Sequence, residues 1–135
     1  MAGYSETPLL KKLGIKQNDV LFLVNAPIEY EEWISPLPEG VATKIRPHPE
    51  SVDFVHLFAF TKKQFETGFT KSKQFIRKNG QLWVSWPKKA SKIETDLDEN
   101  TIREFGLKNG LVDVKVCAVS EVWSGLKFVY RLKDR

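Results

Sequence analysis

Two uninterrupted apolar runs constrain the fold of this chain more than any other feature of its sequence. Residues 19–25 read Asp-Val-Leu-Phe-Leu-Val-Asn, and residues 53–60 hold a second run that ends in Leu-Phe-Ala-Phe. Short runs of this kind are typical of strands that are buried on both faces of a parallel sheet. Helix-like segments alternate with them, which predicts an α/β sheet.

Helix and strand signals divide much of the remaining chain into elements. Four segments have a capping residue, a proline at the first helical position or an apolar face at helical spacing, and we expect helices there. They are residues 8–13, 27–35, 61–78 and 97–107. Further strands are expected at residues 41–45 and, after a turn at Asn79-Gly80, up to Trp86.

Apolar residues occupy every second position in two segments near the end of the chain, residues 112–117 and 126–131. This period of two predicts an antiparallel strand pair with a turn at Ser124-Gly125. In the first strand of the pair, Asp113, Lys115 and Cys117 are then expected to point to one face.

The element order predicts an α/β fold for residues 1–135 as a single domain. It matches a shortened, three-layer Rossmann-like domain of the methyltransferase type, with a mostly parallel sheet and a C-terminal antiparallel strand pair. Such folds bind ligands at the carboxyl ends of their strands. The crossover connections are expected to be right-handed.

Composition limits the setting and the partners of the chain. With 135 residues, two-thirds of the unfolded surface can be buried, and the single cysteine, Cys117, excludes an internal disulfide. We therefore expect a cytoplasmic protein, without a membrane span or a metal site. The net charge of +4 favours anionic partners, but no block of Lys and Arg is long, which argues against nucleic acid.

The turn after the first apolar run lacks the glycines of a usual cofactor loop. It reads Asn25-Ala-Pro-Ile-Glu29, and no glycine lies between Gly14 and Gly40. Glycines let the backbone approach a nucleotide closely, and Pro27 removes an N–H group that could face a phosphate. An atypical site in which Asn25 and Glu29 bind a ribose stays open, but a plain entry into a helix is favoured, and the sequence does not identify a cofactor.

The segment Trp86-Pro-Lys-Lys-Ala-Ser91 follows a predicted strand at the same end of the sheet. As a ligand site, Lys88 and Lys89 would supply charge for an anion, Ser91 a hydroxyl group and Trp86 a stacking face. The alternative is a solvated loop that follows a proline-terminated strand, with Trp86 packed in the core.

Further polar and aromatic residues have both a ligand-binding and a structural interpretation. Asp113 and Lys115 could contact a ligand or form an exposed ion pair of little energetic value. Trp123 could line a ligand site or anchor a turn onto the core. Cys117 is expected to be a small buried thiol, and His56, inside an apolar strand, a hydrogen-bonded core histidine.

Taken together, six segments resemble a family of small bacterial proteins that is classed as a domain of unknown function. They are Gly3–Leu9, Lys11–Ile15, Pro36–Val41, Trp86–Ser91, Val112–Val119 and Trp123–Lys127. The resemblance implies no activity or catalytic residue, because that family has none settled. It implies a shared site for the polar residues of these segments, among them Lys88, Lys89, Asp113, Lys115 and Trp123.

From the sequence we expect a non-catalytic domain that binds a small anionic ligand at the carboxyl end of the sheet. Two alternatives stay open. One is a divergent S-adenosylmethionine-dependent methyltransferase, and the other is a regulatory protein that acts through a protein or nucleic-acid partner. The oligomeric state does not follow from the sequence.

Overall fold

A six-stranded sheet is the middle layer of the computed structural model, which describes residues 8–135. The strand order is β2-β1-β3-β4-β6-β5. The strands are β1 (Val20–Val24), β2 (Ala42–Thr43), β3 (Val52–Phe58), β4 (Ile76–Pro87), β5 (Leu111–Ala118) and β6 (Trp123–Tyr130). Strands β2, β1, β3 and β4 run parallel, whereas β6 is antiparallel to both β4 and β5.

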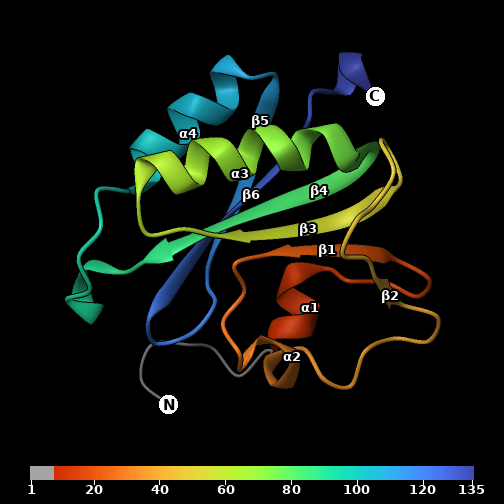
Figure 1. Ribbon diagram of the computed structural model, residues 1–135, viewed down its shortest axis with the longest axis horizontal. Coiled ribbons are helices and arrows are strands. Elements are labelled where there is room, and N and C mark those ends of the chain that lie inside the picture. The colour runs from red at the N-terminus through yellow and green to blue at the C-terminus, as the bar shows by residue number, and fades with distance from the viewer. Residues whose placement is uncertain (1–7) are drawn as a thin grey trace.

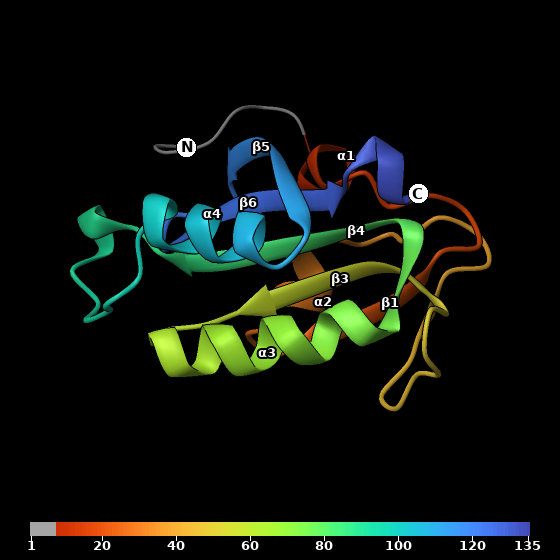
Figure 2. The same cartoon turned by 90° about the horizontal axis from the view of Figure 1, so that it is seen from above.

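Helices cover both faces of this sheet. They are α1 (Leu9–Leu13), α2 (Tyr30–Trp33), α3 (Lys62–Phe75) and α4 (Glu99–Lys108), with short 3-10 turns at Lys89–Ser91 and Leu132–Asp134. Figure 1 shows α3 and α4 above the sheet and α1 and α2 below it, and Figure 2 shows the upper helices from above. The fold is therefore the predicted three-layer, Rossmann-like methyltransferase fold.

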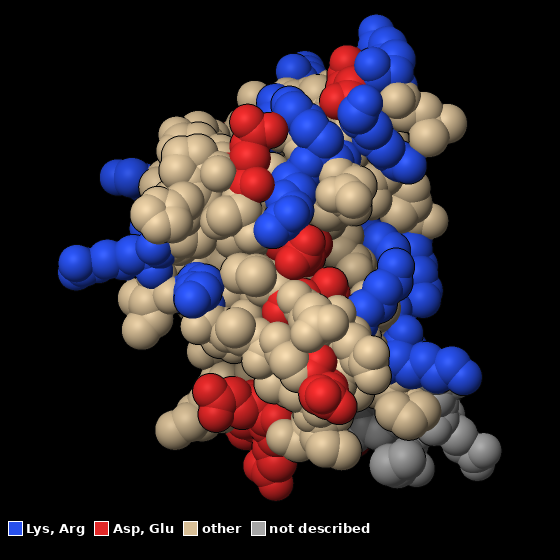
Figure 3. Space-filling model, turned by 90° about the vertical axis from the view of Figure 1, so that its right-hand side faces the viewer, with Lys and Arg blue, Asp and Glu red and all other residues tan. Residues whose placement is uncertain are grey.

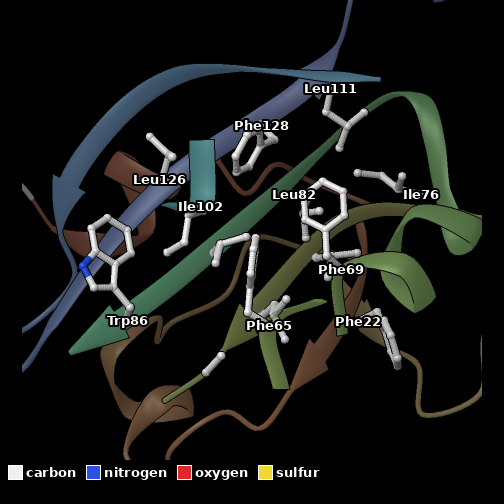
Figure 4. Packing of buried hydrophobic residues seen from close by; sticks show 14 of the residues in the cluster. Phe22, Phe65, Phe69, Ile76, Leu82, Trp86, Ile102, Leu111, Leu126 and Phe128 are labelled. Carbon is white, nitrogen blue, oxygen red and sulfur yellow. The ribbon is translucent and has the colours of Figure 1, made fainter. Parts of the chain in front are cut away.

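The face beneath α3 and α4 is packed almost entirely with apolar side chains. Figure 4 shows Phe65 and Phe69 of α3 and Ile102 of α4 pointing onto the sheet. Phe69 meets the ring of Phe128 edge-on, with the centroids 5.6 Å apart. Apolar residues at helical spacing produce this contact, because they place one stripe of each helix against the strands.

The opposite face carries a second core beneath α1 and α2. Leu13 and Tyr30 of these helices are buried against Phe54, Phe58 and Trp83 of the sheet. Alternation along β3 and β4 supplies both cores, since successive side chains of a strand point to opposite faces.

Two expected boundaries were wrong. Helix α3 ends at Phe75 instead of continuing to residue 78, and Ile76 begins β4 directly. Ile76 is almost fully buried and pairs with Val52, so burial of a β-branched side chain overrides the helical pattern. Asn79 and Gly80 consequently lie inside β4 and form no turn.

The turn of the C-terminal hairpin also differs from the expectation. It lies at residues 119–122, and β6 already begins at Trp123. The Ser120 hydroxyl accepts hydrogen bonds from the amides of Val122 and Trp123, which closes the turn without glycine. Gly125 has another role, because a side chain there would press on Val119.

Segments 27–35 and 41–45 form less regular structure than expected. Only Tyr30–Trp33 is helical, as a single turn, and only Ala42–Thr43 is a strand. No helix in the described residues is long and apolar enough to cross a membrane.

Candidate functional site

The carboxyl ends of β1 and β3 form the point where the chain leaves the sheet in two directions. After β1 the chain enters α2 below the sheet, whereas after β3 it enters α3 above it (Figure 1). In open α/β sheets, ligands bind in the crevice between two such strands. This switch point is therefore the first place to look for a site.

Asn25 shapes the turn at the end of β1. Its backbone is left-handed, with φ of 56°, which asparagine adopts more readily than other side chains except glycine. The Asn25 side-chain amide donates a hydrogen bond to the carbonyl oxygen of Phe58 over 3.3 Å. The residue thus makes the sharp turn that glycine makes in usual cofactor loops, and it ties the end of β1 to the end of β3.

Thr61 and Gln64 begin α3 on the other side of the crevice. The Thr61 hydroxyl accepts a hydrogen bond from the amide of Gln64, and the Gln64 side chain accepts one from the amide of Phe60. These two hydrogen bonds fix the first turn of a helix of 14 residues, and they differ from a capping box in that Gln64 accepts from the amide of Phe60 and not from that of the cap residue Thr61. The positive end of the helix dipole lies at the same end of α3.

A groove of about 430 Å³ runs between the end of β1 and α3, along which it extends from Thr61 to Lys71. We call it the switch-point groove. Its lining residues are Val24, Asn25, Thr61, Lys63, Gln64, Thr67, Gly68 and Lys71. They offer hydroxyl and amide groups together with two ammonium groups. Gly68 lets α3 approach β3 closely, because a side chain there would collide with Leu57.

A buried hydrogen-bond chain connects the elements beneath this end of the sheet. The Tyr30 hydroxyl lies 2.7 Å from Nδ1 of His56, and Nε2 of His56 lies 2.7 Å from the Ser85 hydroxyl. Burial lowers the pKa of His56 to about 3 and raises that of Tyr30, so both groups are neutral. The expectation of a hydrogen-bonded core histidine is confirmed. These hydrogen bonds fix α2, and with it the loop after β1, to β3 and β4.

The segment from Trp86 to Ser91 lies at the carboxyl end of β4, but β3 separates β4 from β1. Trp86 is buried in the core under α3 and α4 (Figure 4). The Ser91 hydroxyl donates to the carbonyl oxygen of Lys88 and accepts from the amide of Ile93, so it closes a local turn. Lys88 is half-buried and Lys89 exposed.

One extra residue in β5 separates the three side chains that were expected to share a face. Asp113 pairs with Phe128 but Lys115 pairs with Lys127, so Val114 forms a bulge. Asp113 consequently lies on the α4 side, where Arg103 donates to it over 2.9 Å. Lys115 and Cys117 lie on the other side, and the expectation of a common face was wrong.

The remaining candidates have packing roles or lie exposed. Trp123 is buried, with its ring 5.0 Å from that of Phe58 and 5.1 Å from that of Phe60. Glu29 is exposed, and its side chain forms no capping hydrogen bond with α2. Burial raises the pKa of the half-buried Cys117 thiol, which disfavours its nucleophilic form.

The switch-point groove contains residues that the sequence analysis did not connect with a ligand. Thr61 was assigned only as a helix cap, and Lys63, Gln64 and Lys71 only as parts of a long helix. The sequence did contain a signal for them. Thr61 caps a helix shortly after an inner strand of the parallel sheet, and this places the first turn of that helix at the ligand-binding end of the sheet. No group of three or more metal-binding side chains occurs within residues 8–135.

Solved structures of a methyltransferase and of proteins that bind S-adenosyl-L-methionine or SAH share this fold. An S-adenosylmethionine-dependent methyltransferase from Aquifex aeolicus is 14% identical, with 89% of this chain and 86% of that chain covered and a TM-score of 0.61. DhpI in complex with SAH is 12% identical, with 93% and 83% covered and a TM-score of 0.64. Aeropyrum pernix fibrillarin with natively bound S-adenosyl-L-methionine is 13% identical, with 92% and 69% covered and a TM-score of 0.57.

No family model matches the sequence, and no curated protein matches it significantly. The fold similarity nevertheless corrects our expectation about function. We expected a non-catalytic domain for a small anionic ligand, but the structures that share the fold include a methyltransferase and proteins in complex with S-adenosyl-L-methionine or SAH. The methyltransferase alternative is therefore the better supported of the two.

Proposed function

We propose that this protein is a divergent S-adenosylmethionine-dependent methyltransferase whose cofactor site is the switch-point groove. The observation that carries the proposal is the position of the groove, which lies at the switch point of a methyltransferase fold. S-adenosylmethionine, when bound, supplies an electrophilic methyl group.

The side chains of the groove fit the polar parts of such a cofactor. The Lys63 ammonium group, near the start of α3, suits its carboxylate, and Thr61, Gln64 and Thr67 suit its amine and ribose hydroxyls. Asn25 supplies the tight turn at the end of β1 that brings backbone close to the groove. The chain departs from the usual loop by having Pro27 in place of an N–H donor and a helix of a single turn after it.

Calorimetric titration of the protein with S-adenosylmethionine and with S-adenosylhomocysteine tests this proposal. We expect both to bind, and Thr67→Tyr to weaken binding at least tenfold by filling the groove. The matched control is Thr70→Tyr, an exposed threonine one turn further along α3 that does not line the groove. No heat with either ligand, or equal losses in the two variants, would overturn the proposed site.

A further inference from the structure

A small polar pocket opens at the amino end of the sheet, the end opposite to the switch-point groove. It has a volume of about 220 Å³ and is lined by Lys16, Asp19, Asp53, Asn79, Gly80, Gln81, Lys127 and Val129. We call it the amino-end pocket. Figure 3 looks onto this end of the molecule and shows acidic side chains near its middle, with lysine and arginine side chains beside them. Lys127 pairs with Trp83 of the lower core, so the pocket lies on the face of the sheet that carries α1.

Interactions within the sheet hold the walls of the amino-end pocket in place. Asp53 accepts a hydrogen bond from the amide of Val20 over 2.8 Å, which joins the start of β3 to β1. The Gln81 side chain donates one hydrogen bond and accepts another, so both of its polar atoms are engaged. A side chain at Gly80 would begin 2.9 Å from the carbonyl oxygen of Asp53, so glycine lets β4 pass close to β3. The pocket is therefore part of the packed sheet.

Both carboxylates of the pocket have partners within the chain. Asp53 forms an ion pair with the Arg77 guanidinium over 3.3 Å, in addition to its bond with the Val20 amide. Asp19 accepts a hydrogen bond from the backbone amide of Lys16 over 3.0 Å, which closes the turn before β1. The charge of Asp53 is thus offset by Arg77, and Asp19 is the carboxylate that remains to offset the lysines.

The ammonium groups of the pocket have no comparable partners. Within residues 8–135, no ion pair engages Lys16 or Lys127. Lys115 lies directly opposite Lys127 on β5, and like charges in such a pair repel one another. Burial lowers the pKa of Lys127, and Lys115 and Lys16 lower it further. The half-buried ammonium group of Lys127 therefore lacks a counter-charge.

A count that includes the carboxylates still leaves positive charge at the pocket. The lining residues and their charged contacts comprise four cations and two carboxylates, an excess of two positive charges. The cations are Lys16, Arg77, Lys115 and Lys127, and the carboxylates are Asp19 and Asp53.

The size and the donors of the pocket limit the ligand that it can accept. Pockets for drug-sized ligands have about 300–1,000 Å³. The amino-end pocket, with about 220 Å³, suits a smaller molecule. Lys16 and Lys127 offer ammonium donors, and the exposed Asn79 side chain offers an amide donor. A carboxylate or a phosphate can accept from all three, whereas an apolar group would leave these donors without a partner.

We propose that the amino-end pocket binds the carboxylate or phosphate group of a small metabolite, with Lys127 and Lys16 as its cationic partners. A charge that is partly removed from water is unfavourable unless it is paired, and the anion supplies the counter-charge that the chain does not provide for Lys127. It also reduces the repulsion between Lys127 and Lys115. The proposal does not depend on the methyltransferase proposal, because the switch-point groove lies at the other end of the sheet.

NMR titration of the ¹⁵N-labelled full chain with sodium phosphate and, separately, with sodium malonate tests this proposal. Sodium chloride keeps the ionic strength constant. We expect saturable shifts of the Lys16, Asn79 and Gly80 amides with at least one anion, and the anion that acts identifies the ligand as a phosphate or a carboxylate. Lys127→Met keeps the alkyl chain but loses the ammonium group, and it should weaken binding about tenfold. Asp19→Asn removes a negative charge from the pocket and should strengthen binding instead.

Lys78→Met is the matched control. Lys78 is exposed at the same end of the sheet, but its ammonium group lies over the ring of Tyr130, which belongs to the core of the opposite face. Its affinity for the anion should stay close to that of the unmodified protein. Equal losses in Lys78→Met and Lys127→Met would reduce the effect to net charge and overturn the site.

The pKa of Lys127 gives a second readout that needs no variant. ¹³C NMR of the lysine side chains measures it with and without the anion. A bound anion favours the charged ammonium group, so the pKa of Lys127 should rise on addition of phosphate or malonate. An unchanged pKa with both anions, shifts that do not saturate, or equal shifts with chloride alone would overturn the proposal.

Discussion

The two faces of the sheet hold their helices by different means. Helices α3 and α4 have 14 and 10 residues, and they cover the upper face through apolar packing. Helices α1 and α2 have only five and four residues. Two side chains of the sheet bind the carboxyl end of α1. The Trp83 indole N–H donates a hydrogen bond to the carbonyl oxygen of Leu13, and the Gln81 side-chain amide donates one to the carbonyl oxygen of Gly14, each over 3.1 Å.

This difference follows from helix length. A helix of one or two turns is unstable by itself, because nucleation costs more than so few hydrogen bonds return. It also buries too few apolar side chains to be held by packing alone. The lower face therefore uses directed hydrogen bonds, in α1 from Trp83 and Gln81 and in α2 through the chain of Tyr30, His56 and Ser85. The two faces should respond to different perturbations.

The largest effect is expected on the upper face. Phe69→Ala removes a fully buried ring that meets Phe65, Phe105 and Phe128 edge-on. It should lower the free energy of unfolding by about 3–5 kcal/mol, because a cavity remains between α3 and the sheet. Urea titration measures this. Phe69→Leu should lose much less, and a loss below about 1 kcal/mol for Phe69→Ala would show that packing does not dominate this face.

The lower face should be the more sensitive to acid. His56 has a pKa of about 3 in the folded protein and an ordinary pKa near 6.5 when unfolded. Below about pH 6.5 the unfolded chain therefore binds a proton that the folded protein does not, and stability falls until the pH reaches about 3. The loss should reach roughly 3 kcal/mol by pH 4.

Urea titrations across this pH range test the acid prediction. His56→Gln should remove this part of the pH dependence, whereas His48→Gln, at an exposed histidine, should leave it in place. Equal pH dependence in the unmodified protein and in His56→Gln would contradict the assignment to His56.

The smallest effect is expected where the sheet holds α1. Gln81→Met removes the hydrogen bond to the carbonyl oxygen of Gly14 and the one that Gln81 accepts from Trp83. The loss should be about 1 kcal/mol and should be concentrated in α1. Hydrogen exchange of the α1 amides should accelerate while that of α3 stays unchanged. Gln74→Met, on α3, is the control, and equal acceleration in both helices would refute a local role.

The apolar pattern of the sequence was enough to predict the main elements of the fold. The runs at residues 19–25 and 53–60 became β1 and β3, because burial on both faces leaves little choice of side chain. The capping signal near residues 96–99 located α4, whose cap is Asp98. The predicted element boundaries were wrong where a tertiary contact determines them. Ile76 fits the helical pattern of the sequence, but it begins β4 because it is buried beside Val52.

The site was less predictable for a physical reason. The switch-point groove is built from polar residues that are ordinary in any exposed helix, and only the position of α3 gives them a role. The segment from Trp86 to Ser91 was conspicuous, but its tryptophan and its serine have packing and turn roles.

The bulge at Val114 has a consequence for how copies of the protein meet. Strand β5 is at the edge of the sheet, and its outer side pairs with no strand within residues 8–135. A long, flat edge of this kind invites strand pairing between molecules and aggregation. The extra residue twists β5 out of a regular ladder, and the exposed Lys115 beside it adds charge at the same place. The bulge that places Asp113 and Lys115 on opposite faces should thus also reduce strand pairing between copies of the protein at this edge.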